Sequence, residues 1–151
     1  MKIKLAVSEE RYEEIAKELT DKGIEIDDSS GLVLTETDRY VSRLSVREFG
    51  EDGSRLHISV DDVVYIEALG HSAEVHGMED VWQTNDRMYH LQMMLDPKQF
   101  VRISNSVIVN KKQIKDIRPS FSQKFVLAMK NSDRVEVTRN YYAAFKRSIG
   151  I

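Results

Sequence analysis

The stretch FVRISNSVIVN, residues 100–110, is the most informative segment of this 151-residue chain. It is rich in β-branched residues, which favour strands, but the polar triplet Ser104-Asn105-Ser106 interrupts it. Arg102 lies just before the triplet and adds a positive charge. The pattern predicts β structure that carries a polar loop beside a basic side chain.

The segments on both sides of this stretch show the alternation of apolar and polar residues that is typical of half-buried strands. Towards the N-terminus the strand candidates are RLSVREFG, SRLHISV, DDVVYIEAL and SAEVHG, and towards the C-terminus they are KFVLAM and RVEVTR. Turns are predicted between them at Glu51-Asp52-Gly53, at Gly70 and at Asn131-Ser132-Asp133. From about Ser42 onward the chain is therefore predicted to be mainly β, and α+β overall.

Three helices are predicted beside the strands. The first follows a short strand at residues 2–7, has Ser8 as its N-cap and closes at Gly23. Residues 24–40 hold a second short apolar run, so the opening segment is predicted to be strand–helix–strand. A second, short helix is predicted after its capping residues 84–86, and a third ends the chain. Their apolar faces consist of Met88, Leu91 and Leu95, and of Tyr142, Phe145 and Ile149.

Charge is distributed unevenly along the chain. From Pro97 to the C-terminus there are twelve Lys and Arg against three Asp and Glu, whereas the first 96 residues contain ten against twenty-two. A basic segment behind an acidic one is a hint of an anionic partner. The sequence has no apolar run long enough for a membrane helix, no cysteine, and an N-terminus unlike a signal peptide. We therefore expect no membrane insertion and a cytoplasmic location.

The sequence contains no pattern typical of an enzyme. The motifs HExxH, GxSxG, GxGxxG and the P-loop are absent. His71 and His76 are five positions apart, which in a regular strand places them on opposite faces and prevents a shared metal. Asp61 and Asp62 lie between two predicted strands and are expected to form a turn rather than an acid/base pair. We predict no enzymatic activity, no catalytic residue, no metal and no cofactor.

The basic residues of the C-terminal part lie mostly in loops and at the ends of predicted elements. Lys111 and Lys112 follow the strand at residues 107–110, Arg118 lies beside a proline, and Arg139 stands where a strand ends and the last helix begins. Such positions suit DNA, because Lys contacts phosphates whereas Arg and Asn make bidentate contacts to guanine and adenine edges. Taken singly, each residue also fits an ordinary exposed charge.

Three separated segments, in the right order and spacing, resemble the LytTR family of bacterial DNA-binding domains: DDVVYIEALG, FVRISNSVIVNKKQIKDI and VEVTRNYYAAFKRSI. The resemblance covers roughly residues 54–150. It implies antiparallel β-sheets with short helices, and loops, rather than a recognition helix, that enter successive major grooves. The resemblance thus implies a sequence-specific transcriptional regulator whose partner is double-stranded DNA.

The resemblance also implies which residues contact DNA. Base-contacting positions fall near His71, on Asn105 and on Arg139, whereas Arg102 and Lys111 fall on flanking positions that suit phosphates. Two residues depart from the family pattern: Ser104 stands where a His is frequent, and Thr138 replaces the usual Ser before the final Arg. The full set of expected DNA-binding residues is Asn105, Arg139, His71, Arg102, Ser104, Lys111, Lys112 and Arg118.

Residues 1–44 are expected to form a separate segment before the DNA-binding domain at residues 45–151. Many family members carry a phosphorylatable receiver domain there, but this segment is too short for one and has Ser8-Glu9-Glu10 where a receiver has aspartates. The chain resembles stand-alone members, which implies control by dimerisation, by a regulatory protein partner or by synthesis level. The helix at residues 8–22 either forms such an interface or packs on its own domain.

Two other classes of function compete with a DNA-binding regulator. The first is a protein-interaction or ligand-binding regulatory module that uses the acidic N-terminal half instead of DNA. The second is RNA binding, for which the basic segments lack the expected aromatic stacking platform. A DNA-binding regulator requires Asn105 and Arg139 on one face of the molecule, and an interaction module does not.

Overall fold

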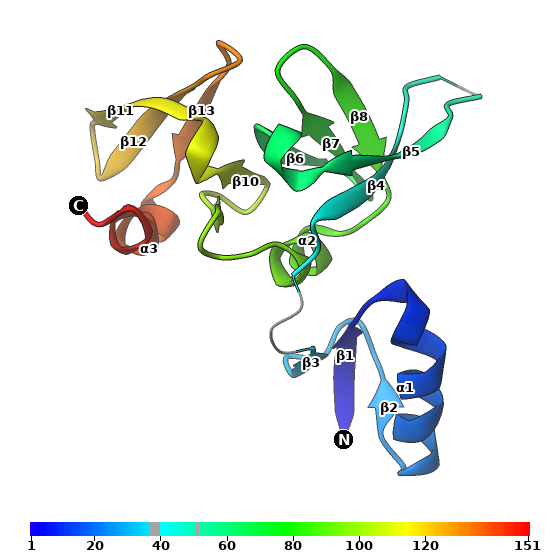
Figure 1. Ribbon diagram of the computed structural model, residues 1–151. Coiled ribbons are helices and arrows are strands. Elements are labelled where there is room, and N and C mark those ends of the chain that lie inside the picture. Colours follow the sequence, from blue (N-terminus) through cyan, green and yellow to red (C-terminus); the bar gives the residue numbers. More distant parts are fainter. Residues whose placement is uncertain (37–39, 51) are drawn as a thin grey trace. The chain divides into compact units, whose positions relative to one another are not determined.

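The computed structural model describes residues 1–36, 40–50 and 52–151, and it divides the chain into two compact units, Met1–Tyr40 and Val41–Ile151 (Figure 1). The second unit thus begins four residues before the boundary at residue 45 that the sequence predicts. Within the described ranges, no helix is long and apolar enough to span a membrane.

The first unit is a small parallel sheet with one helix. Strand β1 (Lys2–Ala6) leads into helix α1 (Glu9–Asp21), and Gly23 follows with a φ of 79°, which glycine adopts without a steric penalty. Two short strands, β2 (Glu25–Ile26) and β3 (Val33–Thr35), pair in parallel on either side of β1. The predicted strand–helix–strand segment thus contains one additional strand. Among the described residues of this unit, the buried apolar side chains are Ile3, Leu5 and Ala6.

The second unit is built on a seven-stranded antiparallel sheet with the order β5-β4-β8-β7-β6-β10-β9. Helix α2 (Met88–Met94) packs Met88 and Leu91 against one face of this sheet, where Val46, Ile66 and Val75 are buried. The strands are β4 (Arg43–Arg47), β5 (Arg55–Ser59), β6 (Tyr65–Leu69), β7 (Ser72–His76), β8 (Val81–Thr84), β9 (Phe100–Arg102) and β10 (Val107–Asn110).

A three-stranded antiparallel sheet and the last helix complete the second unit. The sheet consists of β11 (Ile114–Ser120), β12 (Lys124–Met129) and β13 (Arg134–Val137), and helix α3 (Arg139–Ile149) follows it. Phe145 of α3 is fully buried against Phe125 and Leu127 of β12. Ile103 of the β9–β10 turn and Val109 of β10 belong to the same core, so the two sheets of this unit are held together by shared apolar packing.

Polar side chains also connect the two sheets. The Tyr65 hydroxyl of β6 donates a hydrogen bond of 2.9 Å to Asp133 in the β12–β13 turn. Its ring stacks on His76 with 4.2 Å between the ring centroids, and His76 Nε2 lies 3.1 Å from a carboxylate oxygen of Glu74. Burial, and then the bond to Asp133, raises the pKa of the Tyr65 phenol. Together with the hydrogen bond of 3.1 Å that the Asn131 side-chain amide donates to the Gly77 carbonyl, this contact holds the β12–β13 turn against the larger sheet.

The structure confirms the mainly β fold and differs from the sequence analysis in detail. Strands β8 and β11 were not predicted. The N-cap position of α2 belongs to Arg87 and has no side-chain cap, because Thr84 ends β8 and bonds to Asp86 instead. Asp61 and Asp62 lie in a 3-10 turn (Val60–Asp62), as predicted. The turn predicted at Glu51-Asp52-Gly53 includes Glu51, which lies outside the described residues.

Candidate nucleic-acid interface

Three chain segments meet at one end of the seven-stranded sheet. The Ala68 amide of β6 donates to the Ser106 carbonyl at 2.7 Å, so the β6–β7 and β9–β10 turns are neighbours. The Thr138 amide donates to the Ile103 carbonyl at 3.0 Å, which fixes the start of α3 against the β9–β10 turn. We call this surface the three-loop end; it comprises residues 69–72, 103–106 and 138–141.

The β9–β10 turn is shaped by its own side chains and by Arg102. Ser104 is buried, and its hydroxyl oxygen accepts a hydrogen bond of 3.2 Å from the Ser106 amide. The Arg102 guanidinium donates to the carbonyls of Ser104 and Asn105, and to Gln92 of α2 at 3.1 Å. In this arrangement Arg102 and Ser104 support the loop from within, and Asn105 is exposed at its tip.

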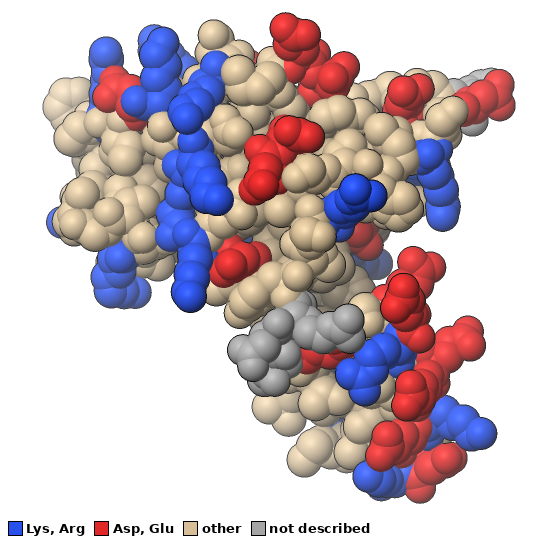
Figure 2. All heavy atoms as spheres, in the orientation of Figure 1, with Lys and Arg blue, Asp and Glu red and all other residues tan. Residues whose placement is uncertain are grey.

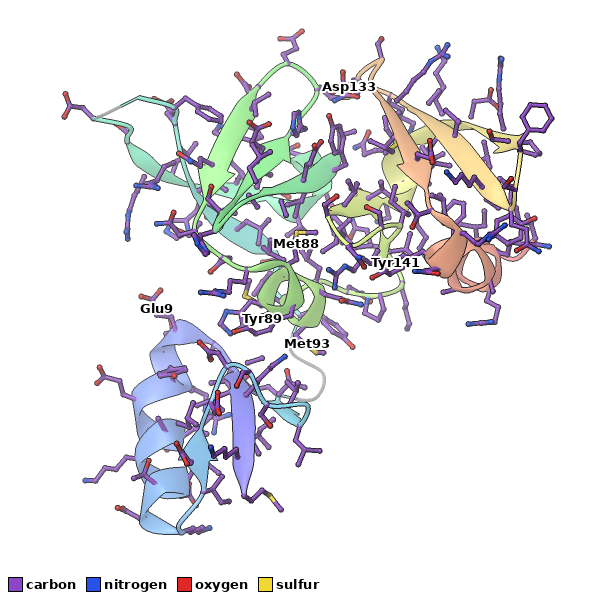
Figure 3. All side chains as sticks on the ribbon, turned by 180° about the vertical axis from the view of Figure 1, so that it is seen from behind. Glu9, Met88, Tyr89, Met93, Asp133 and Tyr141 are labelled. Atoms are coloured by element: carbon purple, nitrogen blue, oxygen red, sulfur yellow. The ribbon has the colours of Figure 1, made fainter. Side chains whose placement is uncertain are left out.

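The side chain of Asn105 is oriented by helix α3. The Tyr141 hydroxyl donates to Asn105 Oδ1 at 2.9 Å, and Figure 3 shows Tyr141 on the side of α3 that faces α2. The Tyr141 ring also lies 5.9 Å from the guanidinium carbon of Arg102. An amide oxygen has two lone pairs, so Asn105 keeps one acceptor site and both N–H donors. These are the groups that recognise the adenine edge in the major groove.

Arg139 is the first residue of α3 and is exposed. The residues before it are anchored, since Val137 is buried in the core and the Thr138 amide is bonded to Ile103. Among the described residues, the Arg139 guanidinium has no hydrogen bond or ion pair. The backbone at this junction is therefore fixed while the charged head remains available, next to the Asn105 loop.

His71 lies in the β6–β7 turn, the third segment of the three-loop end. The turn consists of Gly70 and His71; the φ of 61° at Gly70 is favourable for glycine, and the His71 side chain is exposed. A hollow of about 200 Å³ opens beside His71, and Arg87 and Met88 at the start of α2 form part of its wall. The structure thus brings His71, Asn105 and Arg139 to one end of the second unit.

The other basic residues of the predicted set lie elsewhere. Strand β10 separates Lys111 and Lys112 from the Asn105 loop by about 13 Å, at about 3.3 Å per residue. The Lys111 ammonium donates to the Ser148 carbonyl at 3.1 Å, in the last turn of α3. Arg118 lies on β11, at the edge of the smaller sheet, and forms an ion pair of 2.8 Å with Asp116. Within the described ranges, no side-chain hydrogen bond or ion pair connects these three residues to the three-loop end.

Charge is also segregated on the surface. Figure 2 shows Lys and Arg side chains gathered over the C-terminal part of the second unit, whereas Asp and Glu side chains line α1 of the first unit. The first turn of α3 contains no acidic residue, so nothing there offsets the charge of Arg139. The three-loop end thus combines the exposed guanidinium of Arg139 with exposed hydrogen-bonding groups, which is the combination that duplex DNA requires.

Three further residues contribute to this surface without a recognisable signal in the sequence: Tyr141, Gln92 and Arg87. Tyr141 is one of two adjacent tyrosines in the final helix, and the sequence does not reveal which of them faces the Asn105 loop. Gln92 reaches the surface because α2 lies beside β9, and Arg87 reaches it because the start of α2 lies beside the β6–β7 turn. These neighbourhoods are long-range packing results, and no local sequence pattern indicates them.

Known proteins resemble the second unit of this chain. A family model described as the LytTr DNA-binding domain matches residues 53–150. The chain is 26% identical over 102 residues to the sensory transduction protein LytR of Staphylococcus saprophyticus, which covers 67% of this chain and 40% of that protein. It is 29% identical over 77 residues to the transcriptional regulatory protein LytR of Staphylococcus aureus, covering 51% of this chain and 31% of that protein.

A solved structure shares the fold. A LytTr DNA-binding domain from Bacillus cereus superposes with a TM-score of 0.68 at 27% identity, covering 74% of this chain and 99% of that one. The chain spans less than half the length of the two curated relatives.

Proposed function

The chain belongs to the family of LytTr DNA-binding domains, and from this premise we propose that it is a transcriptional regulator that recognises a specific sequence of duplex DNA through its three-loop end. The observation that carries the proposal is the proximity of Asn105 and Arg139, which lie on adjoining segments and are both exposed. This juxtaposition is what distinguishes a DNA reader from a module that merely carries basic residues. The proposed site of action is the bacterial cytoplasm.

Asn105 and Arg139 are the base-reading residues of this proposal. A planar amide and a planar guanidinium each offer paired groups that match adenine and guanine edges in the major groove. Arg102 and Tyr141 hold Asn105 in place, and Ser104 closes the loop that carries it. His71 adds a hydrogen-bond donor from the neighbouring β6–β7 turn. Lys112, which is exposed, adds long-range attraction for the phosphate backbone, whereas Lys111 mainly caps α3.

The first unit serves assembly, with a second copy of the chain as its partner. Its small core includes no residue of α1, and Leu32, Val33 and Leu34 around β3 are 56%, 38% and 39% exposed. A unit of about 40 residues is at the lower limit for independent stability and gains from oligomerisation. Leu34→Glu should shift the sedimentation behaviour from dimer to monomer. An unchanged mass, together with capture of a cellular protein by this unit, would favour a regulatory protein partner instead.

Selection of bound sequences from a random DNA pool tests the proposed function directly. We expect one enriched motif, and binding to it should weaken with salt by a slope of roughly −0.9 per phosphate neutralised. A pool that shows no enrichment, combined with binding that does not respond to salt, would refute DNA recognition. The acidic α1 would then support the alternative of an interaction module.

A further inference from the structure

The hollow beside the β6–β7 turn has two basic side chains in its wall. It measures about 200 Å³ and is lined by Ala68, Gly70, His71, Ser72, Arg87 and Met88. Both His71 and Arg87 are exposed, and within the described part of the chain neither has a hydrogen bond or an ion pair. The acidic neighbour of Arg87 in sequence, Asp86, is bonded to Thr84 instead. The hollow therefore offers unpaired donors to an anion.

Arg87 differs in this respect from Arg102, the other arginine near α2. The Arg102 guanidinium is occupied by three contacts within the protein, to Gln92 and to the carbonyls of Ser104 and Asn105. That side chain has a structural role and little capacity left for a ligand. Arg87 retains all five N–H donors of its guanidinium.

The hollow adjoins the three-loop end through direct contacts. Ala68 in its wall donates a backbone hydrogen bond to Ser106, in the loop that carries Asn105. Met88 in its wall lies one helical turn before Gln92, which binds Arg102. The wall of the hollow thus contacts the Asn105 loop, and the Asn105 loop contacts the start of α3. A duplex laid over the Asn105 loop and Arg139 therefore passes the hollow.

We propose that Arg87, with His71 as the second donor, holds one backbone phosphate of the bound DNA in this hollow, an inference that rests on the proposed DNA-binding function. The shape favours a phosphate over a base. Base edges lie at the floor of a groove about 8.5 Å deep and need side chains that project, whereas phosphates protrude from the duplex and can enter a recess. His71 donates a hydrogen bond even when its imidazole is neutral.

This contact would set the position of the duplex relative to the base-reading loops. Phosphate contacts fix the register of a protein on DNA, and base contacts supply its specificity. The wall of the hollow and the start of α3 each bond to the loop that carries Asn105, so an anchored phosphate here would align the groove with both Asn105 and Arg139. Arg87 would thus contact the DNA directly. Through that contact it would also position the duplex for recognition by Asn105.

The first test compares Arg87→Gln with Arg134→Gln in the full-length protein. Arg134 is an exposed arginine at the start of β13, the end away from α3, so its loss changes the net charge equally. Using the duplex selected from the random pool and a scrambled duplex, we expect Arg87→Gln to weaken both by the same factor. We also expect the salt slope to fall by about one unit, with no such change for Arg134→Gln.

The second test locates the phosphate. Single neutral methylphosphonates are placed along the selected duplex, and each is measured with the wild-type protein and with Arg87→Gln. We expect one position, or two adjacent ones, at which the neutral linkage weakens wild-type binding but does not further weaken Arg87→Gln. Because each comparison is made within one protein, a change in folding stability of the variant cannot produce this pattern.

The outcomes separate this inference from the proposed function. If the wild-type protein selects no sequence, the proposed function fails and the inference fails with it. If the wild type binds a motif, but the effects of Arg87→Gln and methylphosphonates are additive everywhere, only the inference is overturned. Relaxed selectivity at a single base pair in Arg87→Gln, with an unchanged salt slope, would also overturn it, because Arg87 would then read a base.

Discussion

Removing the hydroxyl of Tyr141 tests whether Asn105 recognises DNA in a fixed orientation. In Tyr141→Phe the hydrogen bond of 2.9 Å to Asn105 Oδ1 is lost, while the ring that packs near Arg102 is retained. The Asn105 amide can then turn its oxygen and nitrogen into each other's places, and only one of these orientations matches adenine. Binding to the preferred duplex should therefore weaken, and binding to a scrambled duplex should not.

The size of the effect follows from the exposure of the contact. A net hydrogen bond is worth about 0.5–1.5 kcal/mol, and because this pair is accessible to water we take the lower half of the range. A loss of about 0.5–1 kcal/mol corresponds to roughly a two- to fivefold rise in Kd for the preferred duplex. The unfolding temperature should fall by no more than about 2–4 °C, since 1 kcal/mol shifts Tm by roughly 4 °C in a domain of this size.

Fluorescence anisotropy with the preferred and scrambled duplexes measures this difference. Tyr142→Phe is the matched control, because Tyr142 is the adjacent tyrosine, stacks on Phe125 and has no hydroxyl bond among the described residues. In an Asn105→Ala background, Tyr141→Phe should have no further effect on specific binding. An equal loss in that background, or an equal loss on both duplexes, would refute the orienting role of Tyr141.

Three further changes have distinct expected results. Arg139→Ala should cost about 1–3 kcal/mol on the preferred duplex and much less on random DNA; a marked fall in Tm would instead make it structural. Lys111→Met should lower the free energy of unfolding, measured with urea, by about 1 kcal/mol through its lost bond to the Ser148 carbonyl, and leave the salt slope of DNA binding nearly unchanged. The raised pKa of Tyr65 means that its contribution to stability is complete below the ordinary value of about 10 and is lost as the pH rises above it. Tm should therefore fall from pH 10 upward, and Tyr65→Phe should weaken that fall.

Local patterns predicted those strands whose two faces differ in polarity. In KFVLAM the side chains of Phe125, Leu127 and Met129 are buried and their neighbours are not, which is the period-2 pattern that the sequence displays. Strand β11 escaped prediction because IKDIRPS is an edge strand with charged residues, a proline and a register shift. Strand β8 has only four residues and follows a turn where a Cβ on Gly77 would lie 2.9 Å from the Trp82 ring. Its position depends on that tertiary contact.

The sequence predicted which residues belong to the candidate site, but not the contacts that bring them together. Asn105 and Arg139 follow from the family resemblance, but their proximity depends on the backbone bond between Thr138 and Ile103, which are 35 positions apart. The hydrogen-bond partner of Ser8 is likewise not predictable from the local sequence. It occupies the N-cap of α1, as predicted, yet its hydroxyl bonds to Glu36 rather than to the helix.

The bracing of the Asn105 loop has a consequence for the DNA. Arg102, Ser104 and Tyr141 hold the loop before any ligand arrives, so little conformational entropy remains to be lost on binding. A stiff protein surface does not adapt to the duplex, and the duplex must bend or change its groove width to meet it. The energy of that deformation depends on base sequence, even where no side chain touches a base. We therefore expect the selected motif to show base preferences in the spacer between the contacted positions, with flexible steps such as TA favoured there.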